Sequence, residues 1–417
     1  MLRLYPAVTL AVISLTLFQG THALRAAPVT PERIAVLPKE EQSRWTDYLA
    51  RSQALAAADA EALQREVAGL KLAQALPTPD GGDFKFDPKS AGTWFSSAEA
   101  TQLADTILSY QAPNGGWSKH TGYSKGPRQP GMQWSSQSQP GQSPHYLSTF
   151  DNGSTTSQIE LLAKVWQATG REDCRAAALR GLDFIFAAQF PSGGWPQVYP
   201  LEGGYHDDIT FNDDAMTHVL ELLRAIEAGL PAFALVDQPR RERAAAALAS
   251  GLRCVIASQI VQDGRKTAWC AQHDPITLSP TTARKMEPAA ISGLESAHVL
   301  EFLMKLPQPA PEIVASIEHG LGWLDRVKVT GIARGKRDGK TTYDPTPGST
   351  EVYWARFYDL TDSHPLFPGR DGVIYTTYEA MAANNKLGYD FYTSQPASIL
   401  KNGQKKWRKM LAQPGRT

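Results

Sequence analysis

Two short clusters of carboxylate and amide side chains are the residues of this chain best suited to chemistry. Asp151-Asn152 and Asn212-Asp213-Asp214 each precede a segment with helical spacing, and neither comes with a thiolate or a close pair of histidines. Oxygen donors on loops suit Ca²⁺ better than a transition metal. Asp and Asn are also favoured N-caps, so either cluster alone could simply begin a helix. Two clusters with more acids than caps require favour a metal site.

Three arginines provide a second signal. Arg284, Arg356 and Arg370 stand in loops or short segments next to aromatics and prolines. The guanidinium group binds planar carboxylates in a bidentate fork, although a single arginine is more often a surface ion pair. Together with Ca²⁺ and with exposed Trp and Tyr rings that pack on sugars, these arginines suit an acidic polysaccharide.

Other catalytic motifs are absent from the sequence. The nine histidines are scattered without an HExxH pattern, and no nucleophile elbow occurs. Gly115-Gly116 and Gly193-Gly194 lack the Lys-Ser/Thr and the preceding strand of a phosphate-binding loop. These absences argue against a zinc protease, a serine hydrolase and a P-loop enzyme.

A repeated loop indicates how these residues are positioned. Residues 111–117 read Gln-Ala-Pro-Asn-Gly-Gly-Trp, residues 189–195 read Gln-Phe-Pro-Ser-Gly-Gly-Trp, and a looser copy runs over 259–269. Each copy ends a stretch with helical spacing. A recurrence of roughly 70 to 80 residues predicts helical hairpins arranged around a ring.

The apolar spacing predicts an all-α-dominated chain with short β segments in 330–375. Helices are expected at 45–73 (with a possible break), after a capping box at 96–99, and at 154–169, 171–190, 213–228, 239–258, 288–306 and 311–327. In antiparallel hairpins every second N-terminus lies at the same end. Asp151, Asp213 and the 282–285 segment should therefore share one end, to which Arg356 and Arg370 return.

The termini and composition set the outer limits. Arg3 and the apolar run 7–18, with small residues near Ala23 or Ala26, predict an export signal over 1–26 and a secreted or periplasmic protein, with a buried N-terminal helix as the alternative. A helical extension over 27–92, a catalytic domain over 93–400 and a solvated basic tail over 401–417 should follow. Lys plus Arg and Asp plus Glu total 42 each, so bulk charge does not steer the chain to nucleic acid or membrane.

Cysteine usage leaves one question open. Cys254 and Cys270 could pair, which would leave Cys174 over, or all three could be buried free thiols. None of their spacings is that of a zinc site.

Seven motifs together resemble the family 10 polysaccharide lyases, which are pectate lyases. The resemblance covers 96–384, and its motifs are Asn-Gly-Gly-Trp-Ser-Lys at 114–119, Thr-Phe-Asp-Asn-Gly at 149–153, Phe-Pro-Ser-Gly-Gly-Trp-Pro-Gln at 190–197, Thr-Phe-Asn-Asp-Asp-Ala-Met at 210–216, Arg284 with Glu287-Pro288, Tyr-Trp-Ala-Arg-Phe-Tyr-Asp at 353–359, and Pro-Gly-Arg at 368–370.

The resemblance implies a fold, a reaction and a set of roles. The fold is an (α/α) toroid with a groove at one end, and the reaction is Ca²⁺-dependent β-elimination on polygalacturonate by an expected monomer. Asp151, Asn152 and Asp213 match the metal cluster. Arg284 matches the catalytic base. Arg356 and Arg370 match substrate-binding arginines, and Lys119 and Trp195 are further candidates for substrate contact.

The implied chemistry is physically coherent, with one tension. The C5 proton lies next to a carboxylate, and positive groups on that carboxylate stabilise the anion that forms when the proton leaves. Arginine rarely gives up its own proton, so a base role for Arg284 rests on the resemblance. Two alternatives are a toroidal glycoside hydrolase with Asp151 and Asp213 as acid and base, and a non-catalytic pectin-binding protein.

Overall fold

Helical hairpins form the scaffold of the chain. The computed structural model describes residues 27–81, 86–136, 147–337, 339–384 and 390–412, so the predicted export signal lies outside the described residues. The helices of the hairpins are α3 (Ala98–Ser109), α4 (Thr156–Thr169), α5 (Glu172–Ala188), α6 (Ala215–Glu227), α7 (Gln238–Ala257), α8 (Gly293–Met304) and α9 (Pro311–Arg326). The helix-dominated prediction is confirmed.

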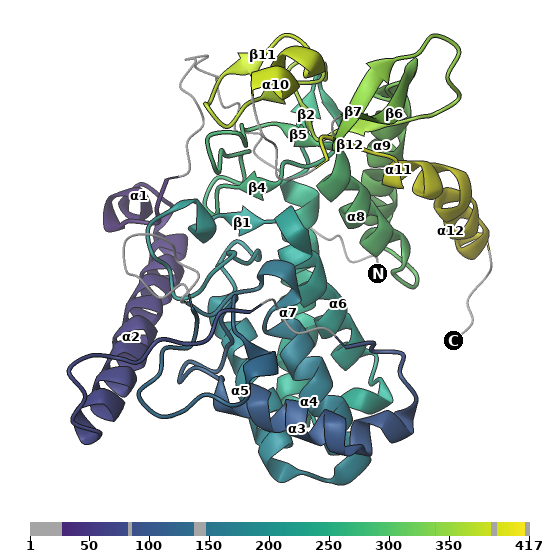
Figure 1. Ribbon diagram of the computed structural model, residues 1–417. Helices are drawn as coiled ribbons and strands as arrows, with labels where there is room; N and C mark the ends of the chain where they lie inside the picture. Colours follow the sequence, from purple (N-terminus) through teal and green to yellow (C-terminus); the bar gives the residue numbers. More distant parts are fainter. Residues whose placement is uncertain (1–26, 82–85, 137–146, 338, 385–389, 413–417) are drawn as a thin grey trace.

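The hairpins follow one another side by side (Figure 1), and their contacts divide the helices into two rows. α4 packs on α5, α6 on α7 and α8 on α9, while α4, α6 and α8 contact one another in series. The helices α3, α5, α7 and α9 form the second row. Because the hairpins are antiparallel, the N-termini of α4, α6 and α8 lie at one end of the scaffold.

One predicted helix begins later than expected. The 288–306 segment is helical only from Gly293, because Ile291–Ser292 forms strand β5 and pairs with β9 (Phe357–Tyr358). Ser292 is the N-cap of α8 and accepts the Glu295 N–H. Similarly, Ser97 rather than Ser96 caps α3.

The repeated loops hold the hairpins together through the same bonds in each copy. The amides of Gln111, Gln189 and Gln259 each donate to a carbonyl in their own loop and to one in the next return helix, at Ala177, Ala247 and Ser316. Left-handed glycines allow close approach: a β-carbon on Gly115 (φ 97°) would lie 2.5 Å from the Arg180 carbonyl oxygen. The looser third copy is therefore a true copy.

The tryptophan that ends each loop is an anchor in the core. Trp117, Trp195 and Trp269 are 0% exposed, and each indole N–H donates to a carbonyl of the preceding return helix, at Ile107, Ile185 and Val255. Trp354 repeats this bond with Leu324, which adds a fourth copy without the loop motif. The prediction that Trp195 contacts substrate is wrong, because its ring is enclosed.

Replacing Trp195 with alanine should therefore act on stability. We expect the free energy of unfolding to fall by about 3–5 kcal/mol, since a large buried side chain is lost and leaves a cavity. Equilibrium denaturation in urea measures this change. An unchanged unfolding midpoint together with a raised KM would restore the substrate-binding role.

Among the described residues, six small antiparallel sheets form in the loops at the end where α4, α6 and α8 begin (Figure 1). They pair β1 (Ile209–Thr210) with β4 (Gln272–His273), β2 (Val261–Gln262) with β3 (Arg265–Lys266), β5 with β9, β6 (Ile332–Arg337) with β7 (Lys340–Pro345), β8 (Trp354–Ala355) with β12 (Tyr392–Thr393), and β10 (Phe367–Pro368) with β11 (Ile374–Tyr375). The pairs β1–β4 and β5–β9 join different connections between the hairpins, whereas β2–β3, β6–β7 and β10–β11 each lie within one connection.

The two ends of the described chain pack on the hairpins. Helices α1 (Pro31–Ala35) and α2 (Lys39–Gly69) lie on one side, and α2 is unbroken over 31 residues. At the other end α10 (Tyr378–Asn384), α11 (Gln395–Ser398) and α12 (Gln404–Leu411) follow. The prediction of a solvated tail is wrong for α12, because Trp407 is buried and Arg408 pairs with Glu318.

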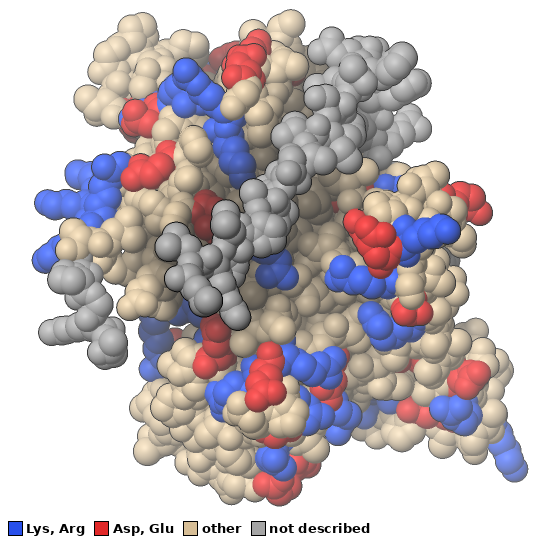
Figure 2. Space-filling model, turned by 180° about the vertical axis from the view of Figure 1, so that it is seen from behind, with Lys and Arg blue, Asp and Glu red and all other residues tan. Residues whose placement is uncertain are grey.

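Cysteine state, membrane spans and surface charge complete the picture. Cys174, Cys254 and Cys270 are buried free thiols, so the disulfide alternative is not realised. Among the described helices none is long and apolar enough to cross a bilayer. On the face shown in Figure 2, positive and negative side chains are interspersed.

Candidate active site

Two turns of the same shape carry the carboxylate and amide clusters. They are η4 (Asp151–Gly153), before α4, and η6 (Asn212–Asp214), before α6, and they lie against each other. Their central residues, Asn152 (φ 52°) and Asp213 (φ 50°), are both left-handed, a conformation that Asn and Asp tolerate. Asp151 therefore corresponds to Asn212, and Asn152 to Asp213.

Neither cluster serves as a helix cap through its side chains. The N-cap positions are Thr155 for α4 and Asp214 for α6, and neither makes a side-chain cap bond. Asp151 and Asp213 are thus left for another role.

Asp151 is a buried carboxylate with one oxygen in use. Its Oδ2 lies 2.5 Å from the Lys119 Nζ, and its side chain is 3% exposed. Its Oδ1 is buried and has no hydrogen-bond donor among the described residues. A buried carboxylate oxygen without a donor is costly unless a cation or another donor reaches it.

Asp213 reaches the surface beside this carboxylate. The Asn212 amide donates to its Oδ2 at 2.6 Å. Burial, followed by the charges of the Asp151 and Glu295 carboxylates, raises the pKa of Asp213 to about 6. The charges of Arg356 and Lys119 oppose this shift. The site thus holds more negative charge than its own cations balance.

Arg356 lies between β8 and β9 and contacts the second turn. Its Nη2 donates to the Asn212 Oδ1 at 3.0 Å and lies 3.5 Å from the Glu295 Oε1. Its side chain is 12% exposed. The geometry therefore gives Arg356 a role in holding the turn, whatever contact it makes with substrate.

Arg284 is held in a bidentate fork. Its Nε and Nη2 donate to the Glu287 carboxylate at 2.9 and 2.5 Å, and its backbone N–H donates to the same group at 3.2 Å. The Arg284 side chain is 48% exposed, whereas that of Glu287 is 5% exposed. A buried carboxylate thus orients an accessible guanidinium group.

The turn that carries Arg370 lies beside the Arg284 segment. Arg370 is exposed in the β10–β11 connection, which Gly369 closes by donating to the Val373 carbonyl. A β-carbon built on Gly372 would lie 3.8 Å from the Lys285 Cβ. The predicted arginines therefore come from three connections at the same end of the scaffold.

Two further residues of the site were missed by sequence reasoning. Tyr205 is half-buried and stacks on His206 with ring centroids 3.8 Å apart. Burial, followed by the Glu287 carboxylate, raises the pKa of Tyr205 to about 12, and the charges of Arg284, Asp151 and Asp213 also act on it. Its position in a Gly-Gly-Tyr-His loop gave no distinctive signal.

His298 is the second missed residue. Its Nδ1 lies 2.7 Å from the Asp214 Oδ1 and its Nε2 2.6 Å from the Gln395 Oε1. Burial opposes its charge, but the bond to Asp214 and that residue's charge raise the pKa of His298 to about 9. Asp214, whose role the sequence left open, therefore joins α6 to α8.

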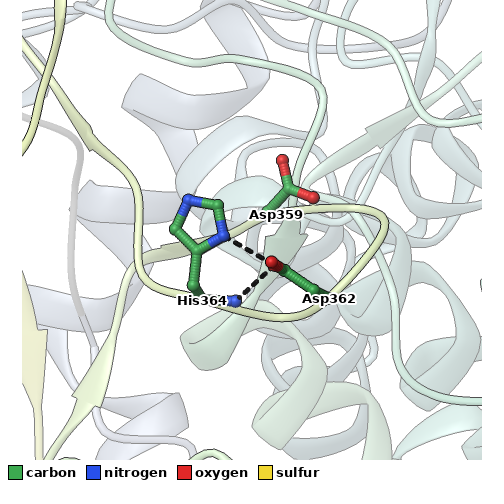
Figure 3. Close-up of side chains that lie close together, drawn as sticks. All are labelled: Asp359, Asp362 and His364. Carbon is green, nitrogen blue, oxygen red and sulfur yellow. Dashed lines mark hydrogen bonds and ion pairs between the residues drawn. The ribbon is translucent and has the colours of Figure 1, made fainter.

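A separate acidic group lies in the loop after β9 (Figure 3). Asp359, Asp362 and His364 bring one ligand atom each within 4.8 Å of one another. Figure 3 shows the Asp362 carboxylate accepting from His364 Nδ1 and from the His364 backbone N–H, at 2.6 and 3.0 Å. Asp359 likewise accepts from the Thr361 N–H. These local hydrogen bonds explain the closeness of the three side chains as a feature of the turn, without a metal ion.

Comparison with known proteins agrees with this arrangement. The model of the pectic acid lyase family matches residues 111–400. Two solved structures of a family 10 polysaccharide lyase from Cellvibrio cellulosa, one of them a mutant in complex with trigalacturonic acid, are each 31% identical with a TM-score of 0.64. The matches cover 98% of each of those chains and 77% and 78% of this one. No curated protein matches.

Helical hairpins, paired carboxylate turns and converging arginines thus define a polysaccharide lyase. The chain belongs to the pectic acid lyase family, among the family 10 polysaccharide lyases, and is an enzyme that cleaves polygalacturonate. The hydrolase and binding-protein alternatives give way to this assignment.

Proposed function

We propose that this pectate lyase needs Ca²⁺ and removes the C5 proton of a galacturonate unit through Arg284. The observation that carries the proposal is the buried, donor-free Asp151 Oδ1 beside the left-handed Asp213. A related lyase was solved with trigalacturonic acid, which supports short de-esterified galacturonate chains as substrate.

The donor set fits calcium. Asp151, Asn152 and Asp213 offer carboxylate and amide oxygens on two adjacent turns. Such hard oxygen donors are the ligands that Ca²⁺ prefers. Burial, followed by the charges of Asp151 and Glu295, raises the pKa of Asp213, and a divalent cation at this position would stabilise its carboxylate form. When bound there, Ca²⁺ would supply positive charge for the substrate carboxylate.

The side chains of the site bind the substrate and remove the proton. Arg370 binds a uronate carboxylate by its fork, and Lys119 and Arg356 add positive charge close to Asp151 and Asp213. Arg284, oriented by Glu287, takes the C5 proton after its guanidinium group has first given up one of its own protons to the solvent. The bond from C4 to the glycosidic oxygen then breaks and leaves a double bond between C4 and C5, without entry of water.

Tyr205 is the proposed donor of a hydrogen bond or proton to the leaving oxygen. A phenol with a pKa of about 12 stays protonated in neutral and alkaline solution. The charges of Glu287, Arg284, Asp151 and Asp213 act on Tyr205, which supports it as the group that donates a hydrogen bond or proton to the leaving oxygen.

The wider setting forms part of the same proposal. The two rows of alternating helices support an (α/α) toroid, with a catalytic domain over 93–400. The apolar run after Arg3 supports export to the periplasm or the medium, and we expect the exported enzyme to be a monomer.

Calcium affinity should fall in acid. The pKa of Asp213 is raised to about 6, so below that pH the carboxyl takes up a proton that competes with the metal, and above it the carboxylate is free. We expect the affinity to fall by up to about tenfold per pH unit below about pH 6 and to level off above about pH 7.

Isothermal titration calorimetry at several pH values tests this. The matched control is Asp213→Asn, which keeps the left-handed turn, should bind weakly and should lack the step near pH 6. A constant affinity between about pH 5 and about pH 7 in the unmodified protein would rule out Asp213 as a ligand.

A further inference from the structure

Helix α2 runs along the loops of the active-site end, although it precedes the region that the family model matches (Figure 1). Its polar side chains bond to several connections between the hairpins. These pairs are Arg44 with the Pro191 carbonyl, Tyr48 with the Ala188 carbonyl, Ser52 with the Leu201 N–H, Asp59 with Asn114, and Glu66 with Arg128 and the Gly131 N–H.

Asp59 makes the contact that leads to the site. One oxygen of its half-buried carboxylate accepts the Asn114 N–H at 2.9 Å, and the other accepts the Asn114 amide at 2.5 Å. Asn114 belongs to the first repeated loop, which ends at Trp117. The carboxylate therefore fixes both the backbone and the side chain of that residue.

Asn114 also contacts the segment that leads to Asp151. Its Oδ1 accepts the Gly116 N–H at 2.8 Å and the Ser148 hydroxyl at 3.0 Å. Ser148 pairs with Ser118, and the next residue, Thr149, donates its N–H to the Trp117 carbonyl at 2.9 Å. The chain of bonds thus reaches the two segments that bring Lys119 and Asp151 together.

The second repeated loop shows that this link is not needed to form the loop itself. There Ser192 occupies the place of Asn114, and its buried hydroxyl has no partner among the described residues. The glutamine bonds and left-handed glycines are the same in both loops. The Asp59–Asn114 contact is therefore an addition to the loop that adjoins Lys119.

We infer that Asp59 is a positioning residue of the lyase site, which acts through Asn114 and Ser148 to hold Asp151 against Lys119. Helix α2 is on this view a working part of the catalytic unit. The inference rests on the proposed roles of Asp151 and Lys119. Partners behind a metal ligand commonly change affinity or activity by about 10–100-fold when removed.

The test compares four variants of the full chain. Asp59→Asn turns an acceptor into a donor that faces the Asn114 amide. Glu61→Gln is the matched control on the same helix, because Glu61 accepts a hydrogen bond from Arg65 of its own helix. Ser148→Ala breaks the chain of bonds one step nearer the site. The double change Asp59→Asn with Asn114→Asp exchanges carboxylate and amide.

We expect Asp59→Asn to lower kcat/KM on trigalacturonate by about tenfold and to weaken calcium binding, measured by calorimetry, with an unchanged circular dichroism spectrum. Ser148→Ala should show a smaller loss, Glu61→Gln none, and the double variant should recover most of the activity. If Asp59→Asn fails to fold, the activity of Ser148→Ala is the test: a loss of activity supports the inference, and full activity contradicts it.

Two results would overturn the inference. One is a folded Asp59→Asn variant with kcat/KM and calcium affinity within about twofold of the unmodified protein. The other is a loss in Asp59→Asn that the double variant does not recover while Ser148→Ala is fully active. An unmodified protein without lyase activity would instead contradict the proposed function.

Discussion

Replacing Asp213 with asparagine is expected to lower kcat/KM on polygalacturonate by on the order of 10³-fold, at unchanged stability. The first turn already places Asn152 at the equivalent left-handed position, so asparagine fits the backbone of the second. What is lost is a carboxylate charge beside the donor-free Asp151 oxygen. Steady-state kinetics at the calcium concentration that just saturates the unmodified protein measure the loss.

Asp263→Asn is the control for the Asp213 variant. Asp263 is also left-handed, at φ 48°, but it lies in the exposed turn between β2 and β3. We expect that variant to keep full activity. An Asp213→Asn variant that is folded and retains activity within about tenfold of the unmodified protein would show that the carboxylate is not a ligand.

Arg284→Lys should separate the base from the binders. Lysine keeps a positive charge but loses the two-pronged contact with Glu287, so its nitrogen is no longer oriented. We expect kcat to fall by roughly 10²–10⁴-fold with little change in KM, the pattern of an interaction made only in the transition state. Initial rates over a range of substrate concentrations give both constants.

Arg370→Lys is the matched comparison for Arg284→Lys. Arg370 is exposed in the β10–β11 connection and is proposed to bind a carboxylate already in the ground state, so its loss should mainly raise KM. A near-normal kcat for Arg284→Lys would make another group the base, and Lys285, which adjoins the Arg370 turn, would be tested next.

Local sequence patterns predicted the scaffold and the end of it that carries the site. Apolar spacing and the repeated Gly-Gly-Trp loops are properties of short segments, so the hairpins and the shared end of Asp151 and Asp213 could be inferred from them. The same reasoning erred on Trp195, because a loop tryptophan that folds back onto its own helix looks like an exposed one in the sequence.

Contacts between distant segments could not be predicted in this way. Asp59 and Asn114 are 55 positions apart, and Asp214 and His298 are 84 apart. Such pairs depend on how the hairpins pack on one another, and the apolar spacing within a single segment carries no information about that packing. The late start of α8 has the same origin, since β5 forms only because β9, from a later connection, lies beside it.

Ultraviolet absorbance of the unsaturated product on polygalacturonate, followed with and without a calcium chelator, tests the central claim most directly. Elimination creates a conjugated double bond that hydrolysis does not, and the donor-free Asp151 oxygen beside Asp213 predicts that the reaction stops without metal. We expect absorbance to rise in calcium, to cease in excess chelator and to resume when calcium is restored. Cleavage at full rate in excess chelator would contradict the account, as would products without the chromophore.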